Sequence, residues 1–165
     1  MSVRERKYLE VGEEAPDFCL PDQANHEVCL HDFKGKYVVL YFIPKEQSPG
    51  CATEGIAFTK LLTEFEDLNT FVVGISPEDP LILSKMKREY NLNIIMLSDR
   101  DQEVINKYGA WAQKEFCGEQ IKGIIRTTYI IDPEGKIGFV WPRVVPEGHA
   151  NEVKEKIEKI REGKV

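Results

Sequence analysis

The sequence contains no apolar stretch that approaches the ~20 residues of a membrane-spanning helix. Its first twelve residues are charged, where a secretory signal would be apolar. Basic residues are also in the minority: 22 Lys and Arg stand against 28 Asp and Glu, and they are not clustered as nucleic-acid binding requires. These absences predict a cytoplasmic protein with an acidic surface that binds neither membranes nor nucleic acid.

The four cysteines, Cys19, Cys29, Cys51 and Cys117, form no C-x-x-C pair, and their spacing matches no zinc-binding pattern. We therefore expect no metal, and no motif requires another cofactor. A chain of 165 residues, 42% of them hydrophobic, can build a sizeable core without a disulfide framework. Redox or nucleophilic use of one or two cysteines is the better expectation.

The order of the apolar segments predicts one α/β domain over residues 1–165. Strands are expected at 37–43, 70–76, 94–97, 124–131 and 136–141, and helices at 51–68, 81–90, about 99–108 and 149–161. The first three strands alternate with helices, as in parallel βαβ units, whereas the last two flank the turn 132–135 and should be antiparallel. The sequence thus predicts a central mixed sheet flanked by helices.

Two further segments hold cysteines. Residues 15–20 and 27–30 flank a turn-rich stretch, which predicts an N-terminal β-hairpin with Cys19 and Cys29 facing each other. We expect both to be small, buried and unreactive, and a disulfide is the alternative because cross-strand neighbours lie close together. Residues 110–123, which include Cys117, lack clear periodicity and are expected to be irregular, as functional or mobile segments often are.

Cys51 has the most informative position in the chain. The apolar run 38–43 ends at Pro44, a short turn follows, and a helical pattern begins near Gly50. Cys51 should therefore lie in the first turn of a helix, at the carboxyl end of a central parallel strand where open α/β sheets place their sites. Free N–H groups and the helix dipole favour an anion there, so we expect a reactive thiolate.

Several reactions of a thiolate can be compared with the sequence. A cysteine protease needs a histidine base, and the sequence does not bring His26, His31 or His149 to Cys51. A thiol phosphatase needs an Arg shortly after the cysteine, and residues 52–58 contain none. A thioredoxin-type oxidoreductase needs a second thiol at the position of Glu54. The remaining reaction is attack on a small electrophile by a single thiolate.

The segment Pro44-x-x-x-Ser48-x-x-Cys51 resembles the active-site signature of the peroxiredoxins. The stretches 15–18, 32–36 and 124–135 resemble the bacterioferritin-comigratory or Q-type branch of that family, and the likeness extends from about residue 11 to residue 161. This resemblance implies a thioredoxin-like fold with an N-terminal hairpin extension. It also implies a thiol-dependent peroxidase that reduces hydrogen peroxide and organic hydroperoxides in antioxidant defence, with Cys51 cycling through a sulfenic acid.

The resemblance also implies roles for other residues of the site. Ser48 would position the peroxide, and backbone N–H groups at Gly50 and Cys51 would stabilise charge on its oxygen. Pro44 would shield the thiolate from water. Arg126 would favour the thiolate and polarise the O–O bond, and Glu54 would orient Arg126.

The way in which Cys51 is regenerated is left open by the sequence. Many members of the branch carry a resolving cysteine five residues after the peroxidatic one, where this chain has Ile56. Either Cys117 resolves the sulfenic acid or an external thiol does, such as thioredoxin or a glutaredoxin-like protein. The branch implies a monomer or a weak homodimer. A non-catalytic peroxide sensor or thiol-relay binding protein is the alternative function.

Overall fold

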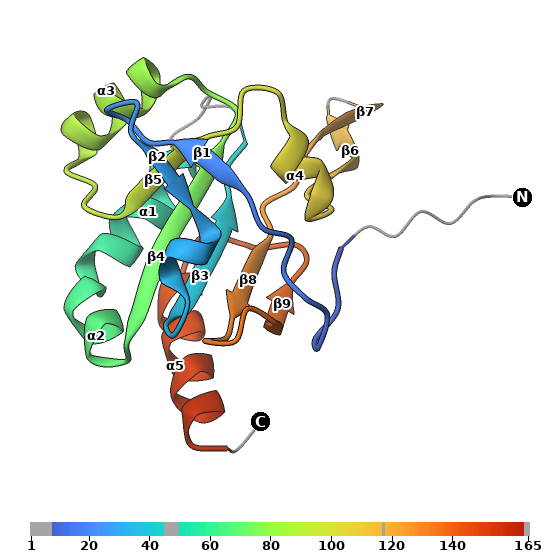
Figure 1. The fold of residues 1–165 in the computed structure, drawn as a ribbon. Coiled ribbons are helices and arrows are strands. Elements are labelled where there is room, and N and C mark those ends of the chain that lie inside the picture. The colour runs from blue at the N-terminus through green and yellow to red at the C-terminus, as the bar shows by residue number, and fades with distance from the viewer. Residues whose placement is uncertain (1–7, 45–49, 117, 164–165) are drawn as a thin grey trace, which may run out of the picture.

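The computed structural model describes residues 8–44, 50–116 and 118–163. A five-stranded sheet lies at its centre, in the order β5 (Ile95–Ser98), β4 (Thr70–Ser76), β3 (Tyr37–Phe42), β8 (Thr128–Ile131) and β9 (Ile137–Trp141) (Figure 1). β3 pairs with β4, and β4 with β5, in parallel, whereas β8 is antiparallel to both β3 and β9. The predicted mixed sheet, with parallel βαβ units and an antiparallel pair, is therefore confirmed.

β3 is buried on both faces of the sheet, as its continuous apolar run predicts. Its residues alternate between two hydrophobic clusters. Leu40 and Phe42 belong to one cluster, and Val39 and Tyr41 belong to the other, and all four are at most 1% exposed. This central position brings the end of β3 to the middle of the sheet.

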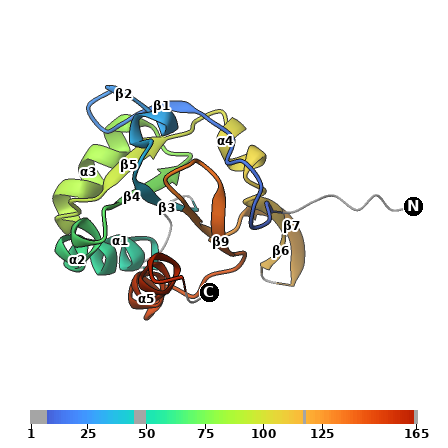
Figure 2. The same cartoon turned by 60° about the horizontal axis from the view of Figure 1, so that its bottom comes forward.

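Different elements cover the two faces (Figure 2). On one face lie α1 (Gly50–Lys60), α2 (Leu62–Asp67), α3 (Pro80–Tyr90) and α5 (His149–Arg161). On the other face lie β1 (Cys19–Pro21), β2 (Glu27–Cys29), the 3₁₀ helix η1 (Leu30–Phe33) and α4 (Glu103–Lys107). The predicted β-hairpin thus covers the face opposite α1.

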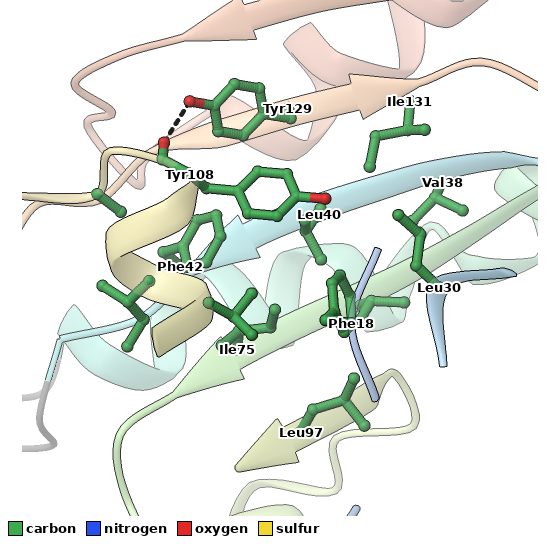
Figure 3. Packing of buried hydrophobic residues seen from close by; sticks show 14 of the residues in the cluster. Phe18, Leu30, Val38, Leu40, Phe42, Ile75, Leu97, Tyr108, Tyr129 and Ile131 are labelled. Atoms are coloured by element: carbon green, nitrogen blue, oxygen red, sulfur yellow. Dashed lines mark hydrogen bonds between the residues drawn. The ribbon is translucent and has the colours of Figure 1, made fainter. Parts of the chain in front are cut away.

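Aromatic rings fill the core under this hairpin (Figure 3). Phe18 packs edge-on against Tyr108, which also contacts Phe42 and Tyr129. The Tyr108 hydroxyl donates to the carbonyl of Pro16, and the Tyr129 hydroxyl donates to the carbonyl of Tyr108. These buried hydroxyls are satisfied by backbone acceptors, so they hold the N-terminal segment to the sheet.

Local signals in the sequence correspond to the ends of several elements. Asp79 caps α3 by accepting the N–H of Ile82, Pro80 occupies the first helical position, and Asn91 ends the helix in the left-handed conformation. In the turn between β8 and β9, Gly135 has a φ of 88°, which glycine adopts readily. No described helix is long and apolar enough to cross a membrane.

Three sequence-based expectations are corrected by the structure. The helix expected over 51–68 is divided at Leu61 into α1 and α2. The strand expected over 124–131 covers only β8, because Ile124 ends another strand. The segment 110–123 is not irregular: β6 (Trp111–Phe116) and β7 (Glu119–Ile124) form a separate two-stranded sheet. Polar residues at 113–115 hide the alternation that predicts a strand.

Candidate active site

Cys51 is the second residue of α1, which follows β3 after a short connection. This confirms that the cysteine lies in the first turn of a helix beyond the carboxyl end of a central parallel strand. The first N–H groups of such a helix have no partner within it. Ser48 lies outside the described residues, and the partly buried Pro44 lies just beyond the end of β3.

Glu54 projects from α1 one turn after Cys51 and is only 1% exposed. Its Oε2 accepts a hydrogen bond of 3.0 Å from Nη1 of Arg126, a residue 72 positions away in the sequence. The Arg126 side chain retains 18% exposure. The fold therefore brings the predicted arginine to Glu54, one turn after Cys51 in α1, as the resemblance implied.

The segment around Arg126 is held by the main chain. The carbonyl of Arg126 accepts from the N–H of Val144, and the carbonyl of Thr127 accepts from the N–H of Phe42, both at 2.9 Å. The N–H of Ile125 donates to the carbonyl of Ala110 at 2.8 Å. These bonds attach residues 125–127 to Phe42, the last residue of β3, and to Ala110 and Val144, so the main chain positions Arg126 for its ion pair with Glu54.

The Glu54 carboxyl is in an environment that opposes its charge. Burial raises the pKa of Glu54 to about 7, although the Arg126 guanidinium lowers it through its charge and its hydrogen bond. Oε1 of Glu54 is buried and has no hydrogen-bond partner among the described residues. One carboxylate oxygen therefore holds the guanidinium, while the other is left unsatisfied.

Tyr41, on β3, is close enough to Glu54 and Arg126 to feel both charges, and it is 1% exposed. Burial raises the pKa of Tyr41, and the nearby Glu54 adds to this effect. Gly74 on β4 makes room for the ring, since a Cβ there would lie 3.0 Å from Tyr41 Cε1. The sequence analysis did not single out Tyr41, because in sequence it is one more apolar residue of a buried strand.

Two of the three histidines have partners of their own. Both ring nitrogens of His149 have partners, Nδ1 with Glu152 at 2.9 Å and Nε2 with the Thr128 hydroxyl at 3.0 Å. Burial lowers the pKa of His149. His31 lies on the opposite face of the sheet, beside Asp17. This placement agrees with the rejection of a cysteine protease.

Cys19 and Cys29 are joined by a disulfide across β1 and β2, where the two residues are directly paired. The favoured expectation of two unreactive thiols is therefore wrong, and the disulfide alternative is correct. The reason is the register: the turn at 22–26, in which Asp22 accepts the N–H groups of Ala24 and His26, places the cysteines opposite each other. Cys117, the internal candidate for resolving the Cys51 sulfenic acid, lies outside the described residues.

Comparison with known proteins decides the family. The profile of the AhpC/TSA family matches residues 11–140. The chain belongs to this family. It is 41% identical to a protein named putative peroxiredoxin bcp from Coxiella burnetii over 88% of this chain and 96% of that one. It is 34% identical to peroxiredoxin Bcp of Bacillus subtilis over 93% and 98% of the two chains.

Solved structures of AhpC/TSA relatives agree with this assignment. The chain matches the bacterioferritin comigratory protein of Xanthomonas campestris with a TM-score of 0.84 and 26% identity, over 92% of this chain and 99% of that one. A PrxQ mutant from Xylella fastidiosa gives a TM-score of 0.86 at 28% identity, over 93% and 98% of the chains. The predicted thioredoxin-like peroxiredoxin fold and the predicted thiol-dependent peroxidase are therefore confirmed, with a hydroperoxide substrate and a thiol reductant in general terms.

Proposed function

We propose that this peroxiredoxin reduces hydrogen peroxide and organic hydroperoxides with Cys51 as the peroxidatic residue, within one domain over residues 1–165. The observation that supports this most strongly is the ion pair between Arg126 and Glu54, which lies in α1 one turn after Cys51. A guanidinium and the free N–H groups of a helix start both favour a thiolate and an anionic oxygen. The bacterioferritin comigratory protein of Xanthomonas campestris, which shares this fold, is described as having alkyl peroxide reduction activity.

The reaction follows from these charges. The Cys51 thiolate attacks the terminal oxygen of the hydroperoxide, an S–O bond forms, and the O–O bond breaks. The leaving oxygen carries the electron pair away and takes a proton to become water or an alcohol. Arg126 stabilises the charge that develops on the oxygens, and the Gly50 and Cys51 N–H groups act with it. Ser48 positions the peroxide, and Pro44 shields the sulfur from bulk water.

Recovery of the thiol requires two electrons from outside the chain. A thiol attacks the Cys51 sulfenic acid, releases water and forms a disulfide, which a second thiol then reduces. Thioredoxin or a glutaredoxin-like protein would supply these thiols, and Cys117 is the internal candidate for the first attack. We further propose that the protein is cytoplasmic and is a monomer or a weak homodimer.

Peroxide consumption with a thiol reductant tests this function. Cys51→Ser should reduce the rate of hydrogen peroxide loss to the uncatalysed background, because serine cannot supply a thiolate. The matched control, Cys19→Ser with Cys29→Ser, removes two sulfurs but leaves Cys51 in place and should retain the activity. Equal peroxide consumption by Cys51→Ser and the wild type would disprove the proposal.

A further inference from the structure

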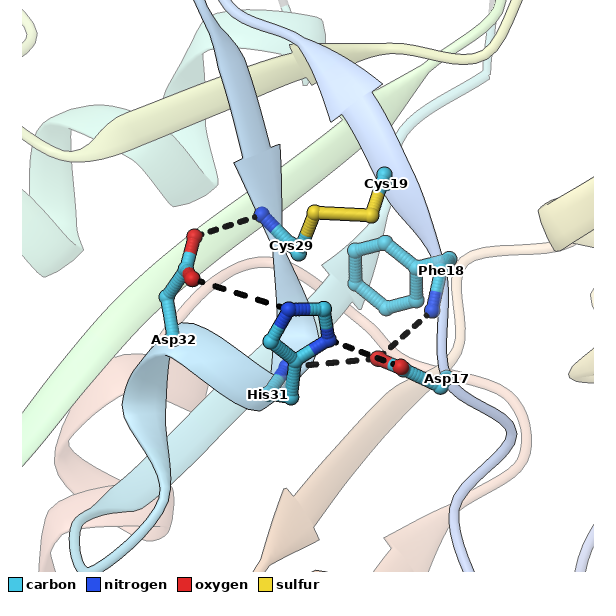
Figure 4. The surroundings of a disulfide bond; sticks show 6 residues. All are labelled: Asp17, Phe18, Cys19, Cys29, His31 and Asp32. Atoms are coloured by element: carbon cyan, nitrogen blue, oxygen red, sulfur yellow. Dashed lines mark hydrogen bonds and ion pairs between the residues drawn. A yellow bond between two sulfur atoms is a disulfide. The ribbon is translucent and has the colours of Figure 1, made fainter.

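The hairpin β1–β2 holds the Cys19–Cys29 disulfide, on the face of the sheet opposite α1 (Figure 4). Cys19 is exposed, whereas Cys29 is 7% exposed and belongs to the buried core. A surface groove lined by Cys19, Arg100 and Lys107, among other residues, runs beside β1. An external thiol can therefore approach the disulfide from the Cys19 side, while Cys29 is shielded.

His31 lies beside this disulfide. A ring nitrogen of His31 and the sulfurs of Cys19 and Cys29 all lie within 4.8 Å of one another. Nδ1 is 2.8 Å from Asp17 Oδ2, and Nε2 is 3.9 Å from Asp32 Oδ1. A neutral imidazole has one N–H, whereas the protonated ring can present an N–H to each carboxylate. The hydrogen bond that the His31 ring donates to Asp17 accordingly raises the pKa of His31.

A cation next to a disulfide changes its chemistry. Exchange is faster when the departing sulfur is a more stable thiolate, and a neighbouring positive charge stabilises thiolates. Asp32 opposes this effect, because its negative charge lies beside Cys29, whose N–H Oδ2 accepts at 2.9 Å. The other carboxylate oxygen of Asp32 lies toward His31. The arrangement thus combines an accessible sulfur, a shielded leaving group and an adjacent imidazole paired with Asp17, which a purely structural cross-link does not need.

We propose that Cys19 and Cys29 form a second redox centre, which exchanges two electrons with a dithiol reductant independently of Cys51. A thiolate of the reductant attacks Cys19 Sγ, the S–S bond breaks, and Cys29 leaves as a thiolate beside His31. The second thiol of the reductant then attacks the mixed disulfide and releases Cys19. The chain gains two electrons and two protons, and the reductant becomes a disulfide. The reverse reaction reoxidises the pair.

The centre can be tested in a Cys51→Ser, Cys117→Ser chain, in which Cys19 and Cys29 are the remaining cysteines. The folded protein is incubated with mixtures of reduced and oxidised dithiothreitol, with a chelator because the reduced sulfurs and His31 could bind metal. Thiol alkylation followed by mass spectrometry then counts the free thiols. We expect zero or two alkyl groups, with a reversible transition in the native state. Reduction that occurs only in denaturant would overturn the proposal.

The role of His31 has its own matched variants. His31→Gln should slow reduction about tenfold at pH values where the imidazole is protonated, because the leaving thiolate then loses a neighbouring positive charge. His26→Gln, in the turn of the same hairpin, should leave the rate unchanged. Asp17→Asn keeps the oxygen that accepts the N–H groups of Phe18 and His31 but loses the partner of the ring, so it should slow reduction similarly.

These variants separate a chemical role from a structural one. Equal rates for the wild type, His31→Gln and Asp17→Asn would exclude His31 from the centre. Because Cys51 is absent from every chain in this experiment, failure of the second centre and failure of the proposed peroxidase would be distinguishable. Peroxide consumption is measured separately, in chains that retain Cys51.

Discussion

The start of α1 and the hairpin β1–β2 each combine cysteine with a side chain that can carry positive charge, but they do so in different ways. At α1 the cation is Arg126, brought from 72 residues beyond Glu54 and 18% exposed. At the hairpin it is His31, whose side chain is 57% exposed and whose partner Asp17 lies 14 residues away. Solvent screens exposed charges more strongly, so the buried arrangement should have the larger chemical effect.

The largest effect is expected at Arg126, the less exposed of the two side chains. Arg126→Met should decrease kcat/KM for hydrogen peroxide about 100-fold, because removal of one preorganised donor to a developing oxyanion typically costs this much. Steady-state peroxide consumption measures it. The circular dichroism spectrum should be unchanged, since main-chain bonds hold residues 125–127. If the fold decrease in kcat/KM caused by Arg126→Met were no greater than the fold decrease in the disulfide-reduction rate caused by His31→Gln, the distinction between the two regions would be contradicted.

The disulfide should also contribute to stability. It closes a loop with a sequence separation of 10, for which loop-closure entropy predicts about 2–3 kcal/mol. Urea unfolding of the wild-type chain with and without reductant should show this difference in the free energy of unfolding. The variant Cys19→Ala with Cys29→Ala should not respond to the reductant. A similar response of that variant would mean that another disulfide causes the effect.

Glu54 should produce an effect on stability that depends on pH. Its folded pKa of about 7 lies above the ordinary value of 4.5, so the folded protein holds a proton that the unfolded chain releases between these pH values. The proton on Glu54 therefore stabilises the folded protein fully below pH 4.5. This stabilisation is lost as the pH rises to 7, by up to about 1.4 kcal/mol per pH unit.

Glu54→Gln isolates this contribution, because the other titrating groups are the same in both proteins. The difference in unfolding free energy, wild type minus Glu54→Gln, should decrease as the pH rises from 4.5 to 7. Urea unfolding at several pH values measures it. A constant or increasing difference would show that Arg126 outweighs burial and keeps the carboxylate ionised.

The sequence predicted the parts of the active site that depend on local order. The run 38–43 predicted a buried central strand, and the helical pattern after it predicted the position of Cys51. Arg126 and Glu54 were associated only through the family resemblance, since no local pattern relates residues 72 positions apart. The paired strands at 111–124 were missed because their polar residues carry no alternation.

The sequence by itself determined most of the strands and helices, the caps of α3 and the helix start near Cys51, because periodicity and capping act over a few residues. Tertiary structure alone decided that Glu54 would be buried against Arg126 and that Cys19 would bond to Cys29. Both depend on how separate segments meet: strand register sets the disulfide, and the main-chain bonds of residues 125–127 set the ion pair. Such contacts follow from the packing of the whole chain, which no short stretch of sequence contains.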